Sequence, residues 1–238
     1  IEKIKERSKT SQLSGSRILI TAGPTREPID PVRFMSNYSS GKMGYAIAVA
    51  AKAKGASVEL ISGPVALNPI TDISTTYVET SSEMYESVKE KVSNFDIFIS
   101  TAAIADYKPA SYSDIKYKKN ENNITIEFTR GIDILETISK KYKNLFTVGF
   151  AAETNSLKEN AQQKLAKKNL DIIVGNIANH ELKLGFESDY NEVTILSNTN
   201  SKKISYDKKS NIANKILDFI AIEYSNKLQL VKSNAKKS

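Results

Sequence analysis

Short apolar runs alternate with amphipathic segments along most of this chain, and turn residues separate them. Residues 17–22, Arg-Ile-Leu-Ile-Thr-Ala, form a run typical of a buried strand, and residues 44–54 are Ala-rich and helical until Gly55. By the same criteria we expect strands at residues 17–22, 58–62, 96–102, 124–128, 146–150, 171–174 and 192–196. Helices are expected at residues 44–54, 81–93, 134–143, 156–168 and 211–224.

This alternation predicts βαβ units and therefore an α/β fold. The expected architecture is a doubly wound, Rossmann-like, mostly parallel sheet with helices on both faces. We expect one domain at residues 17–225, a linker or lead-in at residues 1–16 and a basic C-terminal tail at residues 226–238. Because the first residue is Ile rather than Met, we interpret the sequence as part of a longer chain or a trimmed one.

Composition narrows the possible functions. The chain has no cysteine, which excludes disulfides, thiolate metal sites and a cysteine nucleophile. No stretch approaches the roughly 18 consecutive apolar residues of a membrane span, so we expect a cytoplasmic protein without a membrane partner. The net charge of +7 suggests an anionic partner, such as nucleic acid, an acidic membrane surface or phosphorylated small molecules. Solvated surface lysines would explain much of this charge equally well.

An unusually long loop follows the first predicted strand. Residues 23–43 lie between a strand and its helix, where about 2–6 residues are usual, and such a loop commonly has a function. Its last part, Ser39, Ser40, Gly41 and Lys42, comes just before a helix, where free backbone N–H groups attract phosphate. The pattern is neither a Walker A motif nor G-x-G-x-x-G. An ordered crossover loop without a ligand is the alternative.

Several motifs in the same order resemble those of prokaryotic phosphopantothenoylcysteine synthetases, especially the synthetase domain of bifunctional coenzyme A biosynthesis proteins. The resemblance covers approximately residues 17–225. The motifs are at residues 23–44 (GPTREPIDPVRF…SNYSSGKMG), 102–107 (AAIADY), 116–119 (KYKK), 148–154 (VGFAAET), 164–169 and 185–189.

This resemblance implies a ligase that joins 4′-phosphopantothenate to L-cysteine. The substrate carboxylate would attack the α-phosphorus of CTP to form an acyl-cytidylate and pyrophosphate, and cysteine would then displace CMP. It also implies Mg²⁺, a homodimer, and fusion to or pairing with a flavin-dependent decarboxylase, with no flavin in this segment and no nucleic-acid partner. CTP is favoured, although relatives that accept ATP leave the nucleotide open.

The resemblance also assigns site residues. Asn37 would hold the acyl-cytidylate and, with Lys116 on a loop over the triphosphate, would be catalytic. Asp106 would help to hold Mg²⁺. Phosphate binding falls to Ser39, Ser40, Gly41 and Lys42. Nucleotide binding falls to Ser100, Thr101, Ala102, Asp106, Lys116, Ile132, Asp133, Ile134, Leu135, Phe150, Lys164 and Lys168.

Each assignment has a structural alternative. From the sequence alone, Asn37 fits a turn, Asp106 a helix N-cap, and the cluster at residues 116–119 a solvated surface. Lys164 and Lys168 share a helix face and fit a basic stripe. The only histidine, His180, is expected at the surface. The family often has a proline before Asp133, where this chain has Ile132, so contacts of that loop are less well defined.

Two other classes of protein were weighed. Tyr112 and Lys116 have the spacing of the Tyr/Lys pair of an NAD(P)-binding short-chain dehydrogenase, but they lie in a Ser- and Asp-containing segment rather than a long helix, and the TGxxxGxG loop is absent. A basic nucleic-acid-binding module would be expected to combine basic residues with exposed aromatics or a recognition helix. Only residues 116–119 suggest such a surface.

Overall fold

The computed structural model describes residues 13–117, 123–153, 157–177 and 188–235. Their centre is an eight-stranded sheet in the order β12-β11-β10-β9-β6-β1-β4-β5. Its strands are β1 (Arg17–Ala22), β4 (Ser57–Ser62), β5 (Ser74–Tyr77), β6 (Ile97–Ser100), β9 (Phe146–Glu153), β10 (Ile172–Ile177), β11 (Tyr190–Ser197) and β12 (Ser201–Lys208). All neighbours from β10 to β5 are parallel, whereas β11 and β12 are antiparallel, so the predicted mostly parallel sheet is confirmed.

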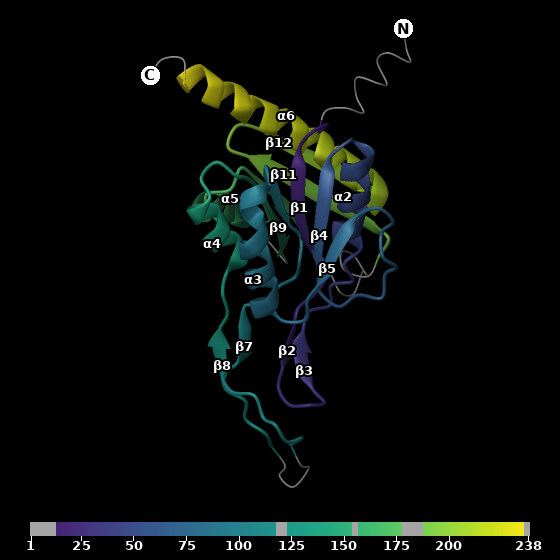
Figure 1. The fold of residues 1–238 in the computed structure, drawn as a ribbon, viewed down its shortest axis with the longest axis vertical. Coiled ribbons are helices and arrows are strands. Elements are labelled where there is room, and N and C mark those ends of the chain that lie inside the picture. Colours follow the sequence, from purple (N-terminus) through teal and green to yellow (C-terminus); the bar gives the residue numbers. More distant parts are fainter. Residues whose placement is uncertain (1–12, 118–122, 154–156, 178–187, 236–238) are drawn as a thin grey trace.

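Helices cover both faces of the sheet, as the sequence predicts (Figure 1). The helices are α2 (Lys42–Ala53), α3 (Ser81–Lys91), α4 (Ile134–Lys141), α5 (Leu157–Lys167) and α6 (Lys209–Ala235). Successive strand residues face opposite sides: Ile18 and Ile20 join the core beneath α2 and α6, and Leu19 joins the core beneath α3, α4 and α5. Among the described residues no helix is both long and apolar enough to cross a membrane.

Two short hairpins lie outside the sheet. They pair β2 (Arg26–Pro28) with β3 (Phe34–Ser36) and β7 (Tyr107–Pro109) with β8 (Phe128–Arg130). Figure 1 shows both projecting beyond the same end of the sheet. The strand predicted at residues 124–128 is wrong, because residues 124–127 have no regular structure and only Phe128 is in a strand. Its alternating pattern has no sheet partner and no buried face, since Ile124 and Phe128 are both exposed.

Other differences concern the sheet edge and the end of the chain. Strand β12 is polar and buries only Ile204, so its sequence gave little strand signal. Helix α6 was expected to end at residue 224, yet it continues through residues 226–235 of the predicted tail. Lys227, with its ammonium 2.8 Å from Asp171, fastens this extension to the sheet. Leu13, in the predicted lead-in, is fully buried in the core.

The order of the strands places a crevice beside β1. From β1 the chain passes through α2 to β4 on one side, whereas from β6 it passes through α4 to β9 on the other. The crossovers that follow β1 and β6 therefore run in opposite directions along the sheet. Ligands of such sheets bind at this point. The loop after β1 fits only because Gly63 follows β4, since a Cβ there would lie 1.8 Å from the carbonyl oxygen of Pro24.

We therefore expect Gly63→Ala to lower the free energy of unfolding by about 1–3 kcal/mol, because the added methyl collides with backbone rather than with a movable side chain. Thermal denaturation measures this as a fall in Tm. Ser57→Ala, at an exposed position of β4, is the matched control and should leave Tm unchanged. Equal Tm values for the two variants would contradict the close approach of the loop.

Candidate active site

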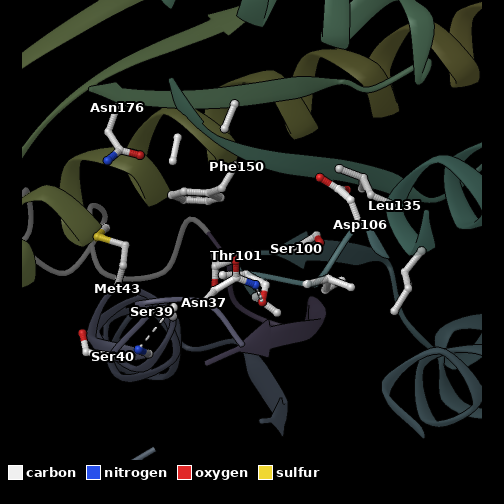
Figure 2. A pocket seen from close by; sticks show the side chains of 18 of the residues that line it. Asn37, Ser39, Ser40, Met43, Ser100, Thr101, Asp106, Leu135, Phe150 and Asn176 are labelled. Atoms are coloured by element: carbon white, nitrogen blue, oxygen red, sulfur yellow. Dashed lines mark hydrogen bonds between the residues drawn. The ribbon is translucent and has the colours of Figure 1, made fainter. Parts of the chain in front are cut away.

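A cavity of about 460 Å³ opens at the carboxyl ends of β1, β6 and β9 (Figure 2). Phe150 and Asn176 lie on one side of it, opposite Ser39, Ser40 and Met43 at the start of α2. All but one of the predicted site residues line this cavity. They are Asn37, Ser39, Ser40, Gly41, Lys42, Ser100, Thr101, Ala102, Asp106, Ile132, Asp133, Ile134, Leu135, Phe150, Lys164 and Lys168.

The start of α2 forms an anion-binding end of the cavity. Gly41, the N-cap residue, precedes the helix with a φ of 75°, a left-handed conformation that favours glycine, and has no side chain that could cap the helix. Ser39 and Ser40 line the cavity beside this first turn, and helix N-termini attract anions through their backbone N–H groups. Lys42 lines the same end and pairs with Asp189 at 2.7 Å.

The floor of the cavity is built from two loops held together by backbone hydrogen bonds. Thr101 donates its N–H to the carbonyl of Thr21 at 3.1 Å, and Ala103 donates to the carbonyl of Gly23 at 2.9 Å. The N–H of Ala105 donates to the hydroxyl of Thr25 at 3.1 Å. Because the small side chains of this segment leave its backbone accessible, a ligand can approach closely.

Asn37 is fixed by the same floor. Its Nδ2 donates to the carbonyl oxygen of Ala103 at 2.8 Å, while the residue as a whole is exposed at the cavity edge. An amide nitrogen carries two N–H groups and the amide oxygen can accept, so Asn37 retains donor and acceptor capacity for a ligand. The tertiary bond shows that this side chain is oriented by the cavity, which the turn interpretation did not anticipate.

The opposite wall comes from α4 and α5. Asp133, rather than Asp106, is the N-cap: its carboxylate accepts the N–H of Glu136 at 2.9 Å and pairs with Lys168 at 2.7 Å. Lys164, one turn before Lys168, also lines the cavity. The wall thus combines two ammonium groups with an acidic cap, and Ile134 and Leu135 are buried behind it.

Asp106 is exposed and lines the cavity. The described residues contain no group of three acidic or histidine side chains that could hold a metal by themselves. This fits Mg²⁺ in one specific way, because Mg²⁺ commonly takes one or two carboxylates and completes its shell with phosphate oxygens and water. Asp106 could supply that carboxylate to a metal carried by a nucleotide.

Three polar residues in the cavity were missed from the sequence: Asn176, Asn191 and Lys209. Asn176 lies near the carboxyl end of β10. Ligands commonly bind at the carboxyl ends of parallel strands, so the strand predicted at residues 171–174 could have pointed to it. Asn191 within β11 and Lys209 at the start of α6 carry no local signal. Burial, followed by repulsion from Lys42, lowers the pKa of Lys209 to about 8, and Asp189 partly opposes this shift.

Lys116 is the predicted site residue that does not line the cavity. It is exposed on the segment between β7 and β8, next to Tyr117, which contacts the β2–β3 hairpin. Residues 118–119 of the lysine cluster, His180 and most of the predicted motif at residues 185–189 lie outside the described residues.

Curated proteins are similar to this chain over most of its length. Coenzyme A biosynthesis bifunctional protein CoaBC of Vibrio vulnificus is 44% identical over 208 residues, which cover 86% of this chain and 52% of that protein. CoaBC of Escherichia coli K12 is 41% identical over 224 residues, which cover 92% and 55%. The chain thus spans about half the length of the curated relatives that it matches.

Solved structures agree with the fold. A crystal structure of the C-terminal domain of CoaBC superposes with a TM-score of 0.78 at 41% identity, covering 91% of this chain and 99% of that one. Cab2 mutant H337A in complex with phosphopantothenate-cysteine has a TM-score of 0.76 at 16% identity, covering 97% and 92%. The family model for the DNA/pantothenate metabolism flavoprotein C-terminal domain matches residues 13–223, and the chain belongs to this family.

Proposed function

We propose that this chain is a CTP-dependent phosphopantothenate–cysteine ligase of coenzyme A biosynthesis. The observation that carries the proposal is one cavity in which a helix N-terminus, lysines from α2, α5 and α6 and a fixed asparagine converge. Homology to the C-terminal domain of CoaBC supports the same function, as does the ligand named in the Cab2 structure.

The first half-reaction needs charge neutralisation. A carboxylate oxygen of 4′-phosphopantothenate attacks the α-phosphorus of CTP, and the bond from that phosphorus to pyrophosphate breaks. The first turn of α2, with Lys42, would hold the phosphates from one end of the cavity. Lys164 and Lys168 would hold them from the opposite wall, so the charge that moves to pyrophosphate is stabilised by fixed donors.

In the second half-reaction the amine of cysteine attacks the acyl carbon, CMP leaves, and the new amide nitrogen releases a proton. Negative charge develops on the carbonyl oxygen during this attack. Asn37 is oriented by Ala103 and would donate its second N–H to that oxygen. With no cysteine in the chain, no thiolate of this chain can form a thioester. In this proposal the activated acid stays bound non-covalently as the acyl-cytidylate.

Mg²⁺ would arrive with the nucleotide, and the chemistry it supplies is neutralisation of the phosphate charge. In this proposal Asp106 is the one protein carboxylate that approaches the metal. Lys116 would contact the triphosphate as a cation carried by the segment between β7 and β8. The dehydrogenase alternative loses its motif, because residues 112–116 are not helical.

The partners also remain proposals. Because the relatives are bifunctional and twice as long, we propose that this domain acts fused to or paired with a flavin-dependent decarboxylase, as a homodimer in the cytoplasm. The assay that tests the function is pyrophosphate release with phosphopantothenate, cysteine and each nucleotide in turn. Absence of release with every nucleotide would refute the ligase.

CTP should support turnover at least about tenfold better than ATP, which requires only about 1.4 kcal/mol of discrimination. Phe150 and the segment from Thr101 to Ile104 frame the part of the cavity where a pyrimidine would fit. Steady-state rates at saturating phosphopantothenate and cysteine measure the ratio. Equal kcat/KM for the two nucleotides would contradict it.

Asn37→Asp should still release pyrophosphate but transfer little acyl group to cysteine. The new carboxylate would face the carbonyl of Ala103, and the lost donor would cost about 2.7–4 kcal/mol in the second step. Asn37→Ala, which removes the donor without adding charge, should show the same division between the steps. Quenched reactions resolved by mass should contain acyl-cytidylate or its hydrolysis products. Product formation at the wild-type rate in both variants would remove Asn37 from the mechanism.

Lys209→Met should stabilise the protein at pH 7 and weaken nucleotide binding. The lowered pKa of Lys209 means that keeping its side chain charged in the folded protein reduces stability below about pH 8. This cost disappears as pH rises toward 10.5, the ordinary pKa of lysine in an unfolded chain. We expect a gain of about 1–3 kcal/mol at pH 7 that shrinks by pH 10, and about tenfold weaker CTP binding by calorimetry.

The exposed neighbour Lys208 provides the control, since Lys208→Met should change neither quantity strongly. A Lys209→Met protein that is less stable than wild type at both pH values would show that its ammonium is a structural contact.

A further inference from the structure

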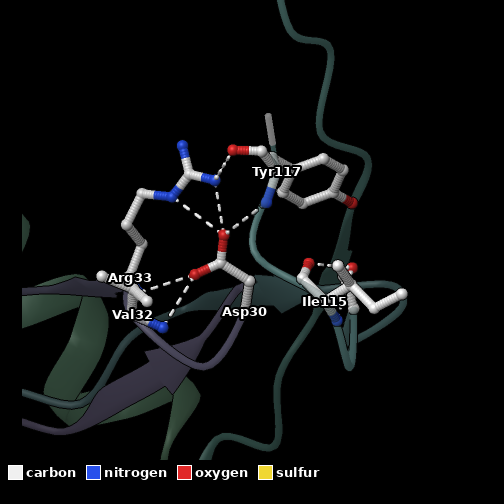
Figure 3. A network of polar contacts seen from close by, with 6 residues as sticks. Asp30, Val32, Arg33, Ile115 and Tyr117 are labelled. Atoms are coloured by element: carbon white, nitrogen blue, oxygen red, sulfur yellow. Dashed lines mark hydrogen bonds and ion pairs between the residues drawn. The ribbon is translucent and has the colours of Figure 1, made fainter. Parts of the chain in front are cut away.

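A buried carboxylate at the tip of the β2–β3 hairpin joins two parts of the chain that lie far apart in sequence (Figure 3). Asp30 accepts five hydrogen bonds, three of them from the N–H and guanidinium of Arg33. The N–H of Val32 donates at 2.9 Å and the N–H of Tyr117 at 3.2 Å. Four of these bonds are within the hairpin turn, and the fifth reaches the segment that carries Lys116.

We call residues 110–127 the arm, which joins β7 to β8 and is described at residues 110–117 and 123–127. Further contacts fasten this arm to the hairpin. Ser113 donates its N–H to the carbonyl of Ile29 at 3.1 Å. The guanidinium of Arg33 donates to the carbonyl of Tyr117 at 3.4 Å and lies 5.5 Å from the centre of its ring. The backbone of residue 117 is thus held through both its N–H and its carbonyl.

The attachment is made at a buried charge. The side chain of Asp30 is 0% exposed, and the Arg33 guanidinium, with the backbone donors, holds its pKa well below the usual range. Releasing residue 117 would take one donor from this buried carboxylate and would also break the bond from Arg33 to the carbonyl of Tyr117. Together with the bond from Ser113 to Ile29, these contacts hold residues 113–117 against the hairpin.

We propose that Asp30 is a positioning residue for Lys116. By holding the backbone of Tyr117, it fixes the point from which the neighbouring ammonium reaches a nucleotide, whether in its own cavity or in that of a second copy. Without the anchor the same ammonium would sample a larger volume and meet the phosphates less often. This inference rests on the proposed function, in which Lys116 contacts the triphosphate.

A double-mutant cycle tests it with Asp30→Asn, Lys116→Gln and the combined variant of the full chain. We expect Asp30→Asn to lower the rate of pyrophosphate release about tenfold or more. We expect no further loss when Lys116→Gln is already present, because Asp30 acts through that side chain. Hydrogen exchange followed by mass spectrometry should show faster exchange at residues 113–117, whether or not the chain is an active ligase.

Glu27→Gln is the matched control. Glu27 is also a buried carboxylate of this hairpin, but it accepts the N–H of Ser81 in α3 and makes no described bond to the arm. The Glu27→Gln substitution should leave hydrogen exchange at residues 113–117 unchanged. Losses that multiply in the Asp30→Asn, Lys116→Gln double variant would overturn the proposal. Unchanged exchange at residues 113–117 in Asp30→Asn would overturn it too, whereas an inactive wild type would refute only the ligase.

Discussion

The close contact between the loops that follow β1 and β6 is the constraint on which the rest of the site depends. These loops are held by backbone hydrogen bonds, such as that from Ala103 to Gly23, and by the hydroxyl of Thr25, which accepts the N–H of Ala105. The contact also requires small residues around it: a Cβ at Gly44 would lie 2.4 Å from the hydroxyl of Thr101. Helix α2 can therefore begin directly against the cavity floor, with its N-terminus at one end of the pocket.

Charge in this cavity comes from elements that lie far apart in the sequence. Lys42 comes from α2, Lys168 extends from the end of α5, and Lys209 begins α6. Lys42 and Lys168 are each balanced by an acidic neighbour, Asp189 and Asp133, so a site for a polyanion is compatible with a folded apo protein. Burial makes Lys209 the costly member of the set, as expected where function rather than stability selects the residue.

The two hairpins extend this organisation away from the sheet. The β2–β3 hairpin is tied to α3 through Glu27 and to the arm through Asp30, two carboxylates that are buried although they lie in a loop. Buried carboxylates need hydrogen-bond donors: Asp30 takes four from its own turn and one from Tyr117, whereas the described donor to Glu27 is the N–H of Ser81 in α3. The β2–β3 hairpin, which follows β1 in the chain, therefore connects the arm to α3.

The sequence by itself determined the strands of the sheet other than its edges β5 and β12, the placement of helices on both faces and most of the cavity lining. Strand and helix periodicity is local, and the strand-end loops carry recognisable motifs such as Ser39 to Lys42. The tertiary structure decided the features that no local stretch of sequence determines. Residues 124–127 alternate like a strand but have no partner, Asn191 and Lys209 enter the cavity from elements whose sequence is ordinary, and Lys116 lies outside the cavity. Burial and pairing depend on distant residues, so no sequence window contains them.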